Sequence, residues 1–281
     1  MKKLLLLLLV VGLFLLTACD FKVTVNGSGE KVEPVVQSVQ KSDEELLDYF
    51  NENISIVEDR KEFFDNSGEL YCYVEKDYLE TSSDDPALKR IATYFGKQEL
   101  SLPDFGDGMI EEMVRVYPED VYFDTKKLSV GGVHNGVVTI YEDTDWWWGS
   151  PHSYPNFYCY SFDMTTGDGY VLPADLVDEI YSKAADACIE IAKENDYAGL
   201  MGDYYTLSGD TIEYMIYDEA NDGYTIDELK LKEAILELLD TGCVEIKSDV
   251  IKFYVDAGYN LCDWASRGMY STIEIPNEWD I

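Results

Sequence analysis

Histidine and paired cysteine motifs are scarce in this chain. Two histidines, His134 and His152, occur among 281 residues, and neither a His-Glu-x-x-His motif nor a Gly-x-Ser-x-Gly motif is present. No Cys-x-x-Cys pair and no Cys/His metal spacing occurs either. The sequence therefore predicts no metal site and no cofactor, and it favours a non-catalytic protein. Glycoside chemistry by two carboxylates stays open, because carboxylates are abundant.

Positive charge is also scarce. Lys and Arg number 21 against 56 Asp and Glu, which gives a formal net charge of -35. Such a field repels the phosphates of nucleic acids, so a nucleic-acid partner is excluded, and it attracts a basic protein, a basic peptide or a metal cation. Surface carboxylates that only keep the chain soluble are the alternative. Hydrophobic residues at 46%, with 22 Tyr and 11 Phe, still predict a folded core.

An apolar run, Leu4 to Leu16, follows Lys2 and Lys3 near the amino terminus. Charge and length are those of an export signal, and the run is too short for a membrane span, which needs roughly 20 apolar residues. We expect residues 1–18 to be removed. Because they contain two lysines and no acid, the mature chain is two charges more negative.

The end of this run, Leu16-Thr17-Ala18-Cys19, resembles the lipobox of bacterial lipoproteins. The resemblance implies that the Cys19 thiol receives a diacylglyceryl group and that the new amino group is acylated, with fatty acids such as palmitate. Two or more chains make a stable anchor. We therefore expect a lipoprotein anchored to the extracytoplasmic face of the cell membrane. An ordinary cleaved signal followed by a free Cys19 is the alternative.

Residues 19–41 are polar, contain Asn26-Gly27-Ser28-Gly29 and show little periodicity, so they predict a flexible tether. Residues 42–281 form the predicted domain. Its five cysteines allow two alternatives. They form up to two disulfides with one thiol left over, or all five are buried free thiols. They are Cys72, Cys159, Cys188, Cys243 and Cys262.

The first part of the domain has clear local signals. Ser42 and Glu45 form a capping box that predicts a helix. The stretch 69–79 alternates in the period of a half-buried strand. Asp85 and Pro86 then predict the start of a second helix that ends near Gly96.

The middle of the domain predicts an antiparallel meander over residues 121–162, in which Asp143-Thr144-Asp145 is expected to be a turn. A long amphipathic helix is predicted over 176–194, and another over 226–239 with Thr225 or Asp222 as its cap. Strands return at 244–246, 250–255 and 270–275, with Ser248-Asp249 as a turn. Together these elements predict an α+β fold, a mostly antiparallel sheet with helices packed on one face.

Several segments of the domain resemble a known family. They are Gly149-Ser150-Pro151-His152, Tyr160 to Gly167, Val250 to Val255 and Ile273-Glu274-Ile275-Pro276. Their order resembles a domain of unknown function found in the extracellular region of the anti-sigma factor RsiV, which binds lysozyme, and in PdaC-type peptidoglycan deacetylases. The resemblance covers about residues 69–276. Ser150-Pro151 departs from the Gly-Ala usual in that family, and the three preceding tryptophans are a further departure.

Candidate ligand-binding residues lie around that first segment. Consecutive strand or loop residues cannot all face one core, so at least one of Trp146, Trp147 and Trp148 is expected to face solvent, where aromatic rings bind sugars or partner side chains. His152 and Tyr154 follow closely and complete the predicted site. There are alternatives to this site. Two of the tryptophans are then core residues with the third covering them, and His152 is hydrogen-bonded to the backbone.

Two acidic turns have structural explanations. Asp163 to Gly167 has the side chains of a hydrogen-bonded turn with a positive-φ glycine. Asp218 to Gly223 lacks the bidentate Glu of an EF-hand, because Leu229 stands at the twelfth position, and a helix-capping loop is expected instead.

Together these features predict a lipid-anchored extracytoplasmic binding protein that captures a basic protein such as lysozyme, or cell-wall material. A cell-wall or carbohydrate-active enzyme and a structural or adhesive surface lipoprotein are the alternatives.

Overall fold

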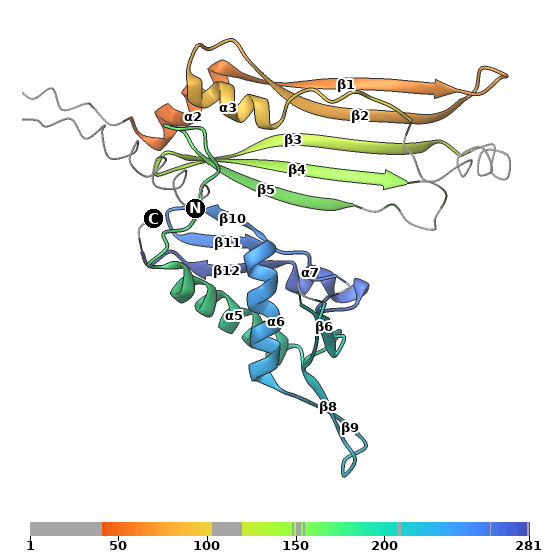
Figure 1. Cartoon of the computed structure of the whole chain (residues 1–281), viewed down its shortest axis with the longest axis vertical. Helices are drawn as coiled ribbons and strands as arrows, with labels where there is room; N and C mark the ends of the chain where they lie inside the picture. Colours follow the sequence, from red (N-terminus) through yellow and green to blue (C-terminus); the bar gives the residue numbers. More distant parts are fainter. Residues whose placement is uncertain are drawn as a thin grey trace, which may run out of the picture. The chain divides into compact units, whose positions relative to one another are not determined.

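The computed structural model describes residues 41–102, 120–147, 149, 153, 155–206, 209–258, 260–279 and 281. In this part of the chain five α-helices accompany mostly antiparallel strands, so the predicted α+β class is confirmed (Figure 1). The predicted signal peptide (1–18), Cys19 and all of the tether except Lys41 lie outside the described residues. What the sequence predicts for them stays a prediction.

Helix α2 (Asp43–Asn53) begins at the predicted capping box. The Ser42 hydroxyl accepts from the Glu45 backbone N–H at 3.3 Å, and the Glu45 carboxylate accepts from the Ser42 backbone N–H at 2.8 Å. The helix continues directly into strand β1 (Ile54–Phe64). The sequence pattern does not reveal this strand, because five consecutive charged residues interrupt any apolar alternation.

Strand β2 (Leu70–Thr81) and helix α3 (Pro86–Tyr94) confirm the next two predictions. Strand β2 pairs antiparallel with β1. The Asp85 carboxylate accepts from the Ala87 backbone N–H at 2.8 Å, so Asp85 caps α3 as expected.

The predicted meander consists of β3 (Tyr122–His134), β4 (Val137–Trp147) and β5 (Asn156–Asp163), which complete a five-stranded sheet in the order β1-β2-β3-β4-β5. The β2–β3 pair is parallel and the other pairs are antiparallel. The turn predicted at Asp143-Thr144-Asp145 is wrong. All three residues lie within β4 and pair with β3, and the first two also pair with β5, so pairing with neighbouring strands keeps this acidic segment extended.

The two faces of this sheet differ in chemistry. Helices α2 and α3 cover one face (Figure 1), where Phe50, Leu88 and Ile91 are completely buried against apolar sheet residues. The neighbouring strands β1, β2 and β3 also carry a cluster of paired charged side chains, which we call the charged patch. It consists of Glu58, Arg60, Glu75, Asp77 and Lys127.

The carboxy-terminal half builds a second core. Helices α5 (Val177–Glu194) and α6 (Glu228–Thr241) share it with a three-stranded antiparallel sheet (Figure 1). The strands of that sheet are β10 (Cys243–Ile246), β11 (Val250–Tyr254) and β12 (Thr272–Pro276). Periodicity alone predicts both helices to within two residues at each end.

Short elements connect α5 to α6 and β11 to β12. The strands pair as two small hairpins, and the helical turns precede β12. These elements are β6 (Asp203–Tyr205), β7 (Thr211–Glu213), β8 (Met215–Asp218), β9 (Gly223–Ile226), the 3-10 helix η1 (Trp264–Ser266) and α7 (Arg267–Tyr270).

The cap predicted for α6 is wrong. Asp227 caps the helix, because its carboxylate accepts from the backbone N–H groups of Leu229 at 3.2 Å and Lys230 at 3.3 Å. Strand β9 extends through Thr225 to Ile226, and Asp222 belongs to the turn before that strand. Hairpin pairing thus delays the helix by a few residues.

The five cysteines of the described domain are free thiols, four of them buried and Cys243 half-buried. Of the two alternatives, the structure therefore has free thiols. No helix among the described residues is both long enough and apolar enough to span a membrane.

Candidate functional site

The five-stranded and three-stranded sheets meet at a polar junction. The Ser161 hydroxyl on β5 donates to the Val244 carbonyl on β10 at 2.8 Å, and Thr139 on β4 lies 3.4 Å from the same hydroxyl. Directional bonds of this kind fix the register between two elements more tightly than apolar contact alone. The junction therefore holds the residues around it in defined positions.

A buried carboxylate lies at the centre of this junction. Glu245 on β10 is 1% exposed and accepts hydrogen bonds from the hydroxyls of Tyr141 and Tyr254, the latter at 3.0 Å. The Lys247 ammonium lies 3.2 Å from the same carboxylate. Burial, reinforced by the neighbouring Glu245, raises the pKa of both phenols. Both tyrosines thus stay protonated donors at neutral pH, and the buried carboxylate is satisfied.

A cleft of about 450 Å³ opens beside these tyrosines. Phe157 and Tyr254 line it with ring centroids 4.9 Å apart, and Asp143 and Arg267 are its charged members. Burial raises the pKa of Asp143, and Arg267 pairs with Asp256 at 3.0 Å. The cleft also includes Pro155 and Asn156, which directly follow the predicted site residue Tyr154.

The structure describes two of the predicted ligand-binding residues. Trp146 and Trp147 end strand β4 and are both half-buried. The Trp147 ring stacks on the ring of buried Tyr122 at 5.6 Å, with 19° between the ring planes, and on Phe123 at 6.4 Å. This stacking gives Trp147 a packing contact at the sheet end, and neither tryptophan lines the 450 Å³ cleft.

The remaining predicted site residues, Trp148, His152 and Tyr154, lie outside the described residues. Their grouping with Trp146 and Trp147 into one ligand site stays a prediction.

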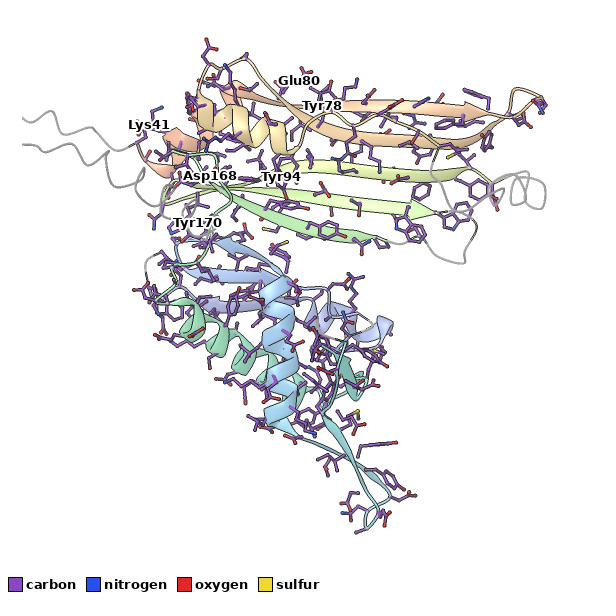
Figure 2. All side chains as sticks on the ribbon, in the orientation of Figure 1. Lys41, Tyr78, Glu80, Tyr94, Asp168 and Tyr170 are labelled. Atoms are coloured by element: carbon purple, nitrogen blue, oxygen red, sulfur yellow. The ribbon has the colours of Figure 1, made fainter. Side chains whose placement is uncertain are left out.

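A second cleft, of about 500 Å³, lies on residues that the sequence did not predict as a ligand site, and we call it the aromatic cleft. Its rings come from α3, β5, the segment before α5, and α5 itself, and Figure 2 shows three of its residues, Tyr94, Asp168 and Tyr170, near one another. No signal in the sequence indicates that these residues form one site, because most of them are far apart along the chain. The rings are Tyr94, Tyr160, Phe162, Tyr170 and Tyr181.

The predicted Asp163 to Gly167 turn forms one edge of the aromatic cleft. The Asp163 carboxylate accepts from the backbone N–H groups of Thr165 at 2.7 Å and Thr166 at 2.8 Å, and Gly167 has a φ of +75°. A Cβ at Gly167 would lie 2.4 Å from the Ala87 carbonyl oxygen of α3. The structural interpretation of this turn is confirmed, and its glycine is required by both φ and space.

The Asp218 to Gly223 segment forms the turn of the β8–β9 hairpin, rather than the helix-capping loop expected from the sequence. The Asp218 carboxylate accepts from the Ala220 backbone N–H at 2.9 Å and from the Asn221 side-chain amide at 2.6 Å. Among the described residues, no group of three His, Cys, Asp or Glu side chains has the geometry of a metal site.

The described residues have the architecture of an α+β domain. No family model matches the chain, and no curated protein matches it. Two similar solved structures are both DUF3298 family proteins. One, from Pseudomonas aeruginosa PAO1, is 14% identical with a TM-score of 0.44, over 79% of this chain and 88% of that chain.

The other, from Bacteroides fragilis NCTC 9343, is 12% identical with a TM-score of 0.45, over 80% of this chain and 89% of that chain. Structural neighbours of this chain are thus described as members of a family of unknown function. Identities and scores this low carry no functional argument, so function has to be argued from the residues of this chain.

Proposed function

We propose that this chain is a lipid-anchored extracytoplasmic binding protein that captures a positively charged protein. Anchoring would occur at Cys19, in the lipobox-like segment. The net charge of -35 favours a basic partner. The sequence resemblance to the domain with which RsiV binds lysozyme supports the same class of partner.

The observation that carries this proposal is the exposed surface of the β8–β9 hairpin. Ile216 is 51% exposed, Tyr217 51% and Tyr224 66%. Tyr217 and Tyr224 are directly paired across the strands, and their rings meet at 5.3 Å in an edge arrangement. Solvent-facing aromatic groups on a protruding hairpin contribute nothing to a core, and tyrosine is prominent in interface hot spots.

Acidic side chains surround these rings. Asp218, Glu219 and Asp222 form the turn, and none of them has an ion pair within the described part of the chain. Lys and Arg side chains bind carboxylates and also lie favourably over tyrosine faces. The hairpin therefore offers a basic surface both kinds of contact at once.

Buried residues hold the hairpin at the point where it joins the rest of the domain. Tyr214, which is fully buried, precedes β8, and its hydroxyl donates to the Leu261 carbonyl at 2.6 Å. Asp227 follows β9, and its backbone N–H donates to the Tyr214 carbonyl at 2.8 Å. In Figure 1 the hairpin extends beyond the amino-terminal end of α6. A fixed base with an exposed tip is an arrangement suited to binding.

Titration of the protein with hen lysozyme, a basic probe, tests the proposal. We expect binding at about 10 mM ionic strength, where screening is weak, and weaker binding at about 150 mM. Absence of binding at the lower ionic strength would overturn capture of this basic protein. Mass spectrometry that found an unmodified Cys19 amino terminus would overturn the lipid anchor separately.

Two charge-matched variants locate the surface. Glu219→Lys on the hairpin and Asp48→Lys on α2 change the net charge equally, and both positions are exposed. We expect Glu219→Lys to weaken lysozyme binding about tenfold and Asp48→Lys to weaken it much less, because only the first charge lies at the proposed contact. Equal losses in both variants would show attraction by overall charge without a specific surface.

A further inference from the structure

The aromatic cleft has a fixed aromatic wall. Tyr94 is 60% exposed, yet its ring is held at 5.4 Å from the Tyr160 ring and at 5.2 Å from the Phe162 ring, with planes inclined by 59° and 69°. Phe95 is 2% exposed and packs edge-on against the same rings from the core side. An exposed ring supported in this way presents a preorganised flat apolar surface to a ligand.

The cleft also has unused hydrogen-bonding groups. Within the described residues, the phenolic hydroxyls of Tyr94, Tyr160, Tyr170 and Tyr181 have no hydrogen-bond partner. Burial raises the pKa of all four phenols, so each remains a neutral group that can both donate and accept. A ligand with many hydroxyl groups would satisfy them.

The charge of the cleft differs from that of the protein as a whole. Among the described residues that line the cleft, the charged ones are Arg90 and Asp168, and they pair with each other at 2.8 Å. The Arg90 guanidinium also donates to the Thr166 carbonyl at 3.2 Å. Local charge is therefore balanced. A phosphate, a carboxylate or a polycation would find no unpaired opposite charge on the described lining residues.

We propose that the aromatic cleft is a binding site for a neutral oligosaccharide built of pyranose rings. A pyranose has an apolar face that matches the Tyr94 ring and hydroxyl groups that match the four phenols. The volume of about 500 Å³ lies within the range of small-ligand sites. This ligand and this place differ from those of the proposed basic-protein capture, so either proposal stands without the other.

Calorimetric titration of the full chain with chitotetraose and with cellotetraose tests the site. We expect saturable binding of at least one of them. Tyr94→Ala and Tyr170→Ala should each weaken it about tenfold, the effect of losing an aromatic contact and its hydrogen bond. Tyr205→Ala is the matched control, because Tyr205 is 59% exposed, lies on β6 and does not line the cleft. The affinity of the Tyr205→Ala variant for the oligosaccharide should be unchanged.

A second measurement needs no substitution. Cys243 lines the same cleft and is half-buried, while the other four cysteines of the domain are buried. A bound oligosaccharide should slow alkylation of Cys243 by a maleimide at least severalfold. Saturable binding that survives Tyr94→Ala and leaves Cys243 alkylation unchanged would overturn the site. Absence of saturable binding by both sugars at millimolar concentration would overturn the ligand class, whatever the outcome with lysozyme.

Discussion

Acidic residues have opposite surroundings in two regions of this molecule. In the charged patch of the five-stranded sheet, the Lys127 ammonium lies 2.7 Å from Glu58 and 3.7 Å from Asp77, and it also pairs with Glu75. The Arg60 guanidinium adds a contact to Glu75 at 2.9 Å. Each carboxylate of this patch therefore has a basic partner within the protein.

The turn of the β8–β9 hairpin has Asp218, Glu219 and Asp222 without a basic partner among the described residues. Hydrogen bonds from Ala220 and Asn221 hold the Asp218 carboxylate in the turn, but no cation in the described part of the chain compensates the repulsion among the three like charges. Net charge alone therefore does not identify a binding surface. Where basic residues are scarce, a binding surface is indicated by the carboxylates that have no basic partner, rather than by the total number of carboxylates.

Removal of the central cation should disrupt the paired region most. Lys127→Met leaves Glu75, 9% exposed, and Asp77, 6% exposed, close together without that ammonium. We expect a loss of about 2 kcal/mol in the free energy of unfolding, less than for a fully buried pair because the Lys127 side chain is 42% exposed. Urea unfolding measures it. Lys89→Met removes an exposed pair with Asp84 and should cost less than about 0.5 kcal/mol. Equal losses would contradict the distinction.

Acid should remove part of this contribution. The Lys127 and Arg60 cations lower the pKa of Glu75 in the folded protein. A carboxyl with a lowered folded pKa stabilises the protein above its unfolded pKa of about 4.3, and that contribution is lost as the pH falls through the folded value. The difference in urea midpoint between wild type and Lys127→Met should therefore be full at pH 7 and shrink below about pH 4. A difference that is constant with pH would show that lost packing, rather than pairing, explains the variant.

The hairpin should show the smallest effect on stability. Tyr217→Ser and Tyr224→Ser remove exposed rings, so each should change the unfolding free energy by less than about 0.5 kcal/mol. Thermal unfolding measures this change, and lysozyme titration of the same samples measures binding. A large loss of stability would show that the rings support the fold and would weaken the interpretation of the hairpin as a contact surface.

Local signals predict helices α2, α3, α5 and α6 well, but they do not reveal the short α7. The capping box at Ser42 and the Asp85-Pro86 start act within one turn of the backbone, and both are present in the structure. Contacts between strands explain two further segments that local signals did not predict correctly, β1 and Asp143 to Asp145. Strand β1 is rich in charge because it is an edge strand, and Asp143 to Asp145 stay extended because β3 and β5 flank them. No window of sequence contains those neighbours.

The candidate site was the least predictable part for the same reason. A run of three tryptophans is visible in the sequence, yet the Trp147 ring stacks on buried Tyr122. The aromatic cleft assembles Tyr94, Tyr160 and Tyr181 from three elements that only the fold brings together. Each of these tyrosines alone is indistinguishable from the other 19 of the 22 in the chain.

Gly167 links the fold to the dimensions of the aromatic cleft. Its Cα hydrogen faces the Ala87 carbonyl of α3, and that close approach brings the helix with Arg90 and Tyr94 to the edge of β5. Any larger residue at position 167 would push α3 away from the Asp163 to Gly167 turn and would shift Tyr94 relative to Tyr170. The position of α3 beside this turn, and with it the shape of the cleft that Tyr94 lines, thus depends on the absence of a single methyl group at residue 167.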